Sequence, residues 1–84
     1  MENSMETITV YTSPSCPYCV MAKRLLANRS RTYEEVDISR DPARLQEMLT
    51  RSGRRTVPQI FIGDRHVGGY DDLARFDQQG QLEV

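Results

Sequence analysis

The sequence lacks the features that mark membrane-spanning, nucleic-acid-binding or exported proteins. It has no run of about 18 apolar residues, the length that a transmembrane helix requires. The formal net charge is -1, and basic side chains gather only at Arg51, Arg54 and Arg55, so nothing favours nucleic acid or an anionic membrane as partner. The first residues carry two glutamates and no apolar segment, unlike a signal peptide. We therefore expect a cytoplasmic protein with a flexible N-terminal extension at residues 1–6.

Cysteine and histidine are also scarce, with two cysteines and one histidine in the chain. A structural disulfide is not expected in the cytoplasm, where thiols are kept reduced. A structural zinc ion needs four ligands, and His66 is the single soft ligand available besides Cys16 and Cys19. Both uses remain alternatives, but redox chemistry of the cysteine pair is the favoured interpretation.

The 84 residues predict a single domain, residues 1–84, of the α/β class. Hydrophobic periodicity and turn residues predict seven elements in order: a strand that starts with the alternation at 7–10 and ends at the turn residues 13–15, a helix at 17–29, a strand at 33–38, a helix at 42–52, strands at 59–62 and 65–67, and a helix from 71. Helices between strands favour a parallel pair, and the hairpin turn at Gly63-Asp64 adds an antiparallel edge. The prediction is a four-stranded mixed sheet of order βαβαββα in sequence, flanked by three helices.

The segment Cys16-Pro17-Tyr18-Cys19 follows the first strand and opens the first helix. Unpaired amides and the helix dipole favour negative charge at a helix N-terminus, so the pKa of the Cys16 thiol should be lowered. Cys19 lies one turn further in and should be less exposed. We predict that Cys16 attacks a disulfide and that Cys19 resolves the product.

Thr56-Val57-Pro58 precedes the most hydrophobic strand. Pro58 has two interpretations. In the first, it only marks the strand entrance, because proline cannot donate a hydrogen bond to a sheet. Alternatively, a cis Val57–Pro58 bond faces the cysteines and turns the Val57 backbone toward an extended thiol peptide; the sequence leaves cis and trans open.

The segment 68–72, Gly-Gly-Tyr-Asp-Asp, leads into the last helix. A helix N-terminus offers backbone amides to a small carboxylate. The alternative is that Asp71 and Asp72 only cap the helix, and the two uses can coexist.

Three motifs in this order resemble the dithiol glutaredoxins: residues 11–19 (YTSPSCPYC), 56–62 (TVPQIFI) and 68–73 (GGYDDL). The likeness covers about residues 7–82 and is greatest to the short bacterial type, glutaredoxin 3. It implies a thioredoxin-like fold with Pro58 cis, and reduction of protein disulfides and glutathione mixed disulfides with glutathione as reductant. It also implies a monomer without a metal cofactor that acts on disulfide-bearing proteins, with ribonucleotide reductase as one candidate.

The resemblance further implies that a set of residues around the cysteines contacts glutathione: Tyr18, Thr56, Val57, Pro58, Gly69, Tyr70, Asp71 and Asp72. Two positions depart from the family pattern. Ser13 stands where many members carry lysine, so Cys16 should depend more on helix amides. Tyr70 stands where most members carry cysteine or serine. Arg55 is a candidate for binding the glycyl carboxylate, and His66 is expected to be an ordinary exposed strand residue.

Two rival functions remain open. One is a redoxin of similar fold that a thioredoxin reductase reduces in place of glutathione. The other is an iron–sulfur carrier, in which two chains share a cluster through Cys16 and glutathione. Pro17 argues against the carrier by resemblance, because cluster-binding relatives usually lack that proline.

Overall fold

The protein has four strands and three helices, described by a computed structural model for residues 7–82. The predicted extension at residues 1–6 lies outside the described residues. The elements are β1 (Ile8–Thr12), α1 (Pro17–Asn28), β2 (Glu34–Asp37), the 3-10 turn η2 (Ile38–Arg40), α2 (Pro42–Ser52), β3 (Gln59–Ile62), β4 (Arg65–Gly68) and α3 (Tyr70–Gln78).

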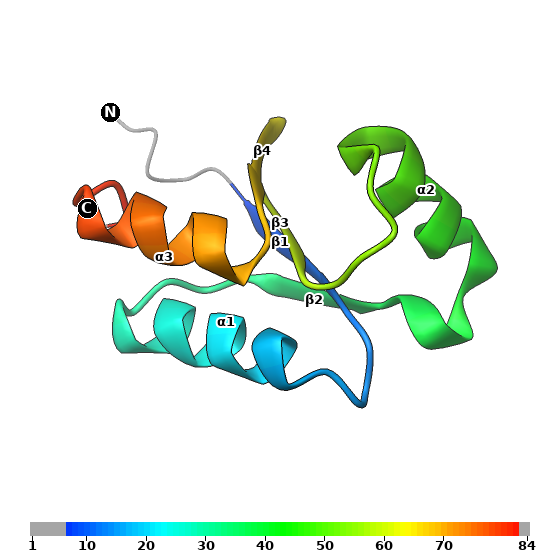
Figure 1. Cartoon of the computed structure of the whole chain (residues 1–84), viewed down its shortest axis with the longest axis horizontal. Helices are drawn as coiled ribbons and strands as arrows, with labels where there is room; N and C mark the ends of the chain where they lie inside the picture. Colours follow the sequence, from blue (N-terminus) through cyan, green and yellow to red (C-terminus); the bar gives the residue numbers. More distant parts are fainter. Residues whose placement is uncertain (1–6, 83–84) are drawn as a thin grey trace.

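The strands form one mixed sheet in the order β2-β1-β3-β4. β1 pairs in parallel with β2 and antiparallel with β3, and β3 pairs antiparallel with β4. Helices α1 and α3 lie together on one face of the sheet, and α2 lies on the other (Figure 1). The predicted four-stranded α/β fold with three flanking helices is confirmed.

The sheet separates two apolar cores. On the α1 and α3 face, Ile8 and Val10 pack with residues of the two helices such as Leu26 and Leu73. On the α2 face, Tyr11 and Phe61 pack with Met48, which is also buried. Because β1 has a neighbouring strand on each side and helices over both faces, all five of its residues are buried, threonines included.

Two predicted boundaries shift by one residue. The second strand ends at Asp37, because the Asp37 carboxylate accepts a hydrogen bond from the Ser39 backbone at 2.9 Å and starts the turn η2. The last helix begins at Tyr70, because Gly69 serves as its N-cap. Within residues 7–82, no helix combines the length and apolar character that crossing a membrane would take.

Polar contacts tie α2 to the sheet. The Tyr11 hydroxyl donates a hydrogen bond to Glu47 and accepts one from Arg51 at 2.9 Å. Burial, followed by the bond to the Glu47 carboxylate, raises the pKa of Tyr11. The Arg51 guanidinium also lies 4.0 Å from the centre of the Phe61 ring, in a cation–π contact. These contacts hold the end of α2, and the loop that follows it, against the middle of the sheet.

The start of α2 gives a prediction on stability. Asp41 is the N-cap, and its carboxylate accepts hydrogen bonds from Ala43 N at 3.2 Å and Arg44 N at 3.3 Å. We expect Asp41→Ala to lower the free energy of unfolding by about 1 kcal/mol, because two amides lose their acceptor. Asp41→Asn is the matched control and should lose less. Urea denaturation checks this, and equal stability of Asp41→Ala and the unchanged protein would contradict it.

Candidate active site

Cys16 is the N-cap of α1, with Pro17 at the first helical position. Its carbonyl accepts hydrogen bonds from Cys19 N at 3.1 Å and Val20 N at 3.2 Å. Its sulfur accepts a further hydrogen bond from Cys19 N, also at 3.1 Å. An amide that points at the sulfur stabilises a thiolate there more than a neutral thiol.

The two cysteines form a disulfide, with their Cα atoms 5.2 Å apart. Their exposure differs sharply: Cys19 is 1% exposed, whereas Cys16 is half-buried. An external thiol can therefore reach the sulfur of Cys16 but not that of Cys19, and this is the asymmetry that a division into attacking and resolving thiols requires.

The loop before β3 faces the disulfide. The Val57–Pro58 peptide bond is cis, so the structure has the second of the two alternatives that the sequence left open. The Val57 carbonyl oxygen lies 3.6 Å from Cys16 Sγ. Pro58 is buried beneath the loop, and Val57 is half-buried at the edge of the site.

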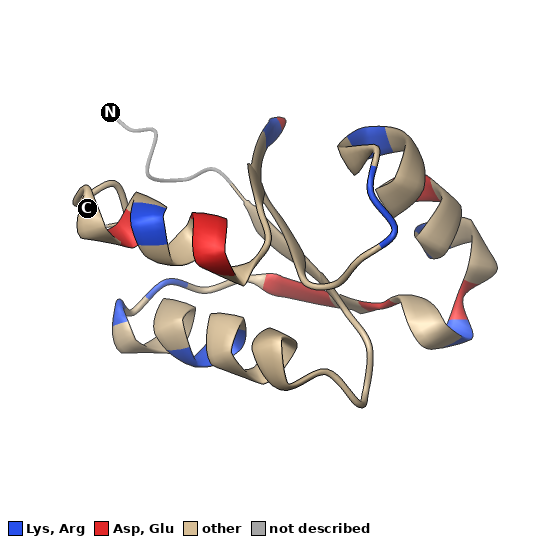
Figure 2. Cartoon of the chain, viewed as in Figure 1, with Lys and Arg blue, Asp and Glu red and all other residues tan. Residues whose placement is uncertain are grey.

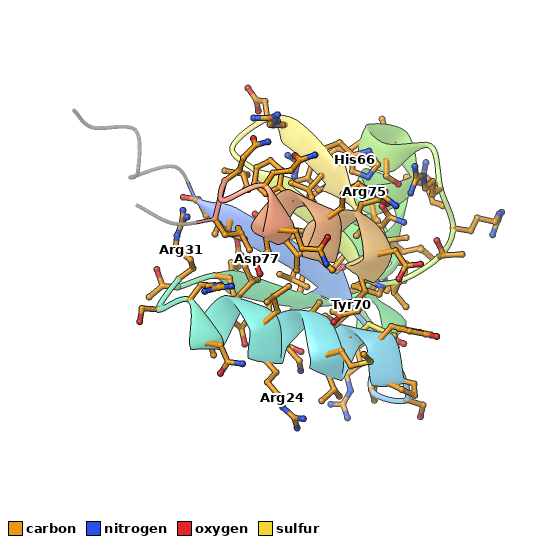
Figure 3. The ribbon with its side chains drawn as sticks, turned by 60° about the vertical axis from the view of Figure 1, so that its left-hand side comes forward. Arg24, Arg31, His66, Tyr70, Arg75 and Asp77 are labelled. Carbon is orange, nitrogen blue, oxygen red and sulfur yellow. A yellow bond between two sulfur atoms is a disulfide. The ribbon has the colours of Figure 1, made fainter. Side chains whose placement is uncertain are left out.

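A cleft of about 290 Å³ opens beside this loop. Its walls are formed by Tyr18, Arg54, Thr56, Val57, Pro58, Gln59, Gly69, Tyr70, Asp71 and Asp72. All eight residues predicted to contact glutathione are therefore brought together. The rings of Tyr18 and Tyr70, from the starts of α1 and α3, lie 6.1 Å apart between their centres at the cleft. Tyr70 is labelled at the start of α3 in Figure 3. Tyr18 is 58% exposed and so is available to a ligand.

The start of α3 forms one wall through a tight turn. The Asp72 carboxylate accepts a hydrogen bond from Gly69 N at 3.0 Å, and this bond is the main cause of its lowered pKa. Gly68 has φ 122°, and a Cβ there would collide with the Asp72 carboxylate. Asp72 thus caps the helix, whereas Asp71 is exposed at the cleft.

The cationic wall of the cleft comes from Arg54, which sequence reasoning did not single out. Basic residues occupy the loop between α2 and β3 (Figure 2). Arg54 lines the cleft and pairs with Asp72 at 3.5 Å, whereas Arg55 is not among the lining residues. The loop thus places Arg54 beside Asp72 of α3 on the cleft wall, and the role expected of Arg55 stays a prediction.

Gln59 is the second residue missed, and its contacts overturn the expectation for His66. Gln59 is 1% exposed although it also borders the cleft, and its side chain is hydrogen-bonded to Thr56 and His66. His66 is half-buried and stacks on Phe61 at 4.7 Å, so it is not an ordinary exposed strand residue. A signal was available, because Gln59 is the one polar residue in an apolar strand.

Comparison with known proteins places the chain in a family. The family model described as "Glutaredoxin" matches residues 8–67. The chain belongs to the glutaredoxin family. A glutaredoxin of Neisseria meningitidis is 51% identical over 80 residues, with 94% of each chain covered. Glutaredoxin 3 of Escherichia coli is 46% identical over 79 residues, covering 94% of this chain and 95% of that protein.

The fold of this glutaredoxin is also shared by a solved structure with a ligand. The crystal structure of a buckwheat glutaredoxin–glutathione complex has a TM-score of 0.81 and 28% identity, covering 95% of this chain and 76% of that one. The predicted thioredoxin-like fold and the predicted class, a thiol–disulfide oxidoreductase with a Cys16–Cys19 pair, are confirmed. Within the described part of this glutaredoxin, no three side chains of His, Cys, Asp or Glu cluster as metal ligands.

Asp72 gives a prediction on pH dependence. Its pKa is lowered in the folded protein from an ordinary value of 3.8, so its ionised form adds stability above about pH 4 that is lost as pH falls through the folded value. We expect Asp72→Asn to unfold more easily than the unchanged protein by about 0.5–1 kcal/mol at pH 7, a small difference because solvent screens the exposed third of the side chain. Denaturation curves at several pH values should show this gap closing below about pH 4. A gap that stays constant to pH 2 would refute the assignment.

Proposed function

We propose that this glutaredoxin reduces glutathione mixed disulfides and protein disulfides, with glutathione as the reductant. The observation that carries the proposal is the half-buried Cys16, whose sulfur lies between an amide of α1 and the carbonyl of Val57, a residue that lines the cleft of about 290 Å³. We further propose that the chain acts as a single domain, in the cytoplasm and as a monomer, on disulfide-bearing proteins. Ribonucleotide reductase is one candidate substrate.

The chemistry starts from the reduced pair. The Cys16 thiolate attacks the glutathione sulfur of a mixed disulfide, the substrate sulfur–sulfur bond breaks, and the protein thiolate leaves and takes a proton from water. A second glutathione thiolate then attacks the glutathione sulfur held on Cys16. This step releases glutathione disulfide and restores the Cys16 thiolate, which the amide of Cys19 stabilises.

Protein disulfides follow a second route through Cys19. After Cys16 has attacked and formed a mixed disulfide with the protein, the Cys19 thiolate attacks the Cys16 sulfur and the protein thiolate departs. The product is the Cys16–Cys19 disulfide of this structure. Two glutathione molecules then reduce it through Cys16, and they leave as glutathione disulfide.

The cleft offers each part of glutathione a matching group. The backbone of Val57, turned outward by the cis bond, can pair with the cysteinyl residue, with Thr56 and Pro58 beside it. At the other end, the amides at the start of α3 suit the γ-glutamyl carboxylate, and the exposed Asp71 carboxylate suits its ammonium group. The aromatic rings of Tyr18 and Tyr70 lie between these two ends.

The glycyl carboxylate of glutathione needs a cation, and we assign this role to Arg54. Arg54 lines the cleft, and its guanidinium is half-exposed although it pairs with Asp72. The buckwheat glutaredoxin, which shares the fold, was solved as a complex with glutathione, and this supports glutathione as the ligand.

The cysteine variants test the proposed roles. Cys16→Ser should lower the reduction of a glutathionylated peptide by at least about a hundredfold, because the nucleophile is lost. Cys19→Ser is the matched variant; it should keep that activity and lose most reduction of protein disulfides. An assay coupled to glutathione reductase measures both. Similar losses for the two variants on the glutathionylated peptide would contradict the assigned roles.

The same preparation separates the rival functions, which the family match does not favour. Reduction of the Cys16–Cys19 disulfide by a thioredoxin reductase, but not by glutathione, would replace the proposal with the redoxin. A brown protein after anaerobic purification with glutathione, inactive on mixed disulfides, would replace it with the iron–sulfur carrier. Colourless protein that is active with glutathione supports the proposal.

A further inference from the structure

A buried glutamine joins the cleft loop to the edge strand of the sheet. Gln59 Nε2 donates hydrogen bonds to the Thr56 carbonyl at 3.0 Å and to the Thr56 hydroxyl at 3.1 Å. Gln59 Oε1 lies 2.7 Å from Nε2 of His66 on β4. Within residues 7–82, the hydrogen bonds of Thr56 go to Gln59 alone. The position of Thr56 in its loop therefore depends on this one side chain.

The donor and acceptor atoms of Thr56, Gln59 and His66 determine the direction of each hydrogen bond. A backbone carbonyl only accepts, so the Gln59 amide nitrogen must face Thr56, and the amide oxygen must face His66. An amide oxygen also only accepts, so His66 Nε2 must carry a proton. The neutral imidazole is therefore the Nε2–H form. The imidazolium would donate the same bond, so the contact holds in both protonation states.

Neighbouring residues hold the imidazole in place. The His66 ring stacks on the Phe61 ring at 4.7 Å between centres, with 24° between the planes. The charged groups around His66 are Arg51 of α2, Arg54 of the cleft loop and Asp72 of α3. Burial first, and then the Arg54 and Arg51 charges, lower the pKa of His66, while Asp72 opposes them.

His66 itself does not line the cleft, whereas Thr56, Val57 and Gln59 do. The hydrogen bonds of His66 reach the cleft loop through Gln59, which in turn donates to Thr56. The loop carries the Val57 carbonyl, which lies 3.6 Å from Cys16 Sγ. A Gln59 amide free to rotate would release Thr56, and the loop would spend part of its time away from the position opposite the sulfur.

We propose that His66 is a positioning residue that, through Gln59, holds the Thr56–Pro58 segment in the conformation that binds the glutathione part of a mixed disulfide. This inference rests on the proposed function and deepens it. His66 acts on binding and not on the sulfur chemistry, because it does not contact the cysteines. Its loss should therefore raise the KM for a glutathionylated substrate and leave kcat nearly unchanged.

Two amide substitutions of His66 give a matched test. The amide nitrogen of glutamine is as many bonds from Cβ as His66 Nε2, so His66→Gln can still donate to Gln59 Oε1. The asparagine amide is one bond shorter, reaches only the position of Nδ1, and cannot donate. Both variants lose the stacked ring equally, so they differ only in the hydrogen bond.

We expect His66→Asn to raise the KM for a glutathionylated peptide about threefold to tenfold, the worth of one hydrogen bond, with kcat within about twofold. His66→Gln should keep the KM of the unchanged protein within about twofold. Arg65→Gln, a neighbour on the same strand that lies outside the cleft, is the control and should change neither constant. Equal KM values for His66→Asn and His66→Gln would overturn the proposal.

The outcomes separate this inference from the proposed function. If the unchanged protein fails to reduce the glutathionylated peptide, the proposed function fails. If it is active but the two His66 variants behave alike, the positioning role alone fails.

A measurement on the unchanged protein covers the case in which His66→Asn does not fold. The ¹⁵N NMR shifts of the neutral imidazole should report the Nε2–H form, and the Gln59 side-chain amide protons should exchange more slowly than those of the exposed Gln46. Finding the Nδ1–H form would overturn the hydrogen bond on which the inference depends.

Discussion

The site depends on the approach of the Val57 carbonyl to the Cys16 sulfur, two atoms 3.6 Å apart from residues separated by 41 positions in the chain. Cys16 supplies a sulfur that accepts a hydrogen bond from the Cys19 amide of the same helix. Val57 supplies the backbone edge along which a thiol peptide can lie. Neither group alone selects a substrate. In the proposed function, their closeness allows the peptide backbone beside the attacked disulfide to pair with Val57 while its sulfur meets Cys16.

The sheet produces this closeness through strand direction. β1 and β3 are antiparallel, with Tyr11 opposite Gln59, so the end of β1 lies beside the start of β3. The chain that leaves β1 reaches Cys16, and the chain that enters β3 passes through the cis Val57–Pro58 bond. The two loops must therefore meet at the same edge. Helix α3 follows the hairpin partner of β3, and its first turn closes the third side of the cleft.

Charge is distributed in the cleft so that opposite signs remain next to one another. Arg54 and Asp72 form an ion pair across it, and the Asp72 carboxylate is further stabilised by the amide of Gly69. A zwitterionic tripeptide suits such a surface better than a simple anion does. The buried Gln59 and the half-buried His66 beside this surface carry no obligatory charge, so they can order the loop without changing the charge that a ligand meets.

Local signals in the sequence determined the helices and strands, and also the place of the cysteine pair at the start of a helix. The helix start at Cys16, the cap at Asp41 and the apolar strand 59–62 are set by a few neighbouring residues, whose periodicity and capping preferences act over one or two turns. These signals, with the three motifs, indicated the mixed sheet and the residues around the cleft. These local signals do not depend on which residues pack against the other face of the sheet.

Tertiary packing decided the rest, because the directions of loop side chains depend on distant segments. The choice of Arg54 over Arg55 follows from where α3 places Asp72. The link from His66 to Thr56 exists because the β3–β4 hairpin sets an imidazole beside a buried amide. The sequence allowed both isomers of the Val57–Pro58 bond, and the structure has the cis isomer opposite the sulfur. Contacts between residues far apart in the chain leave no pattern in the local sequence. A loop side chain can make suitable hydrogen bonds in several directions, and only the packing of distant segments selects one of them.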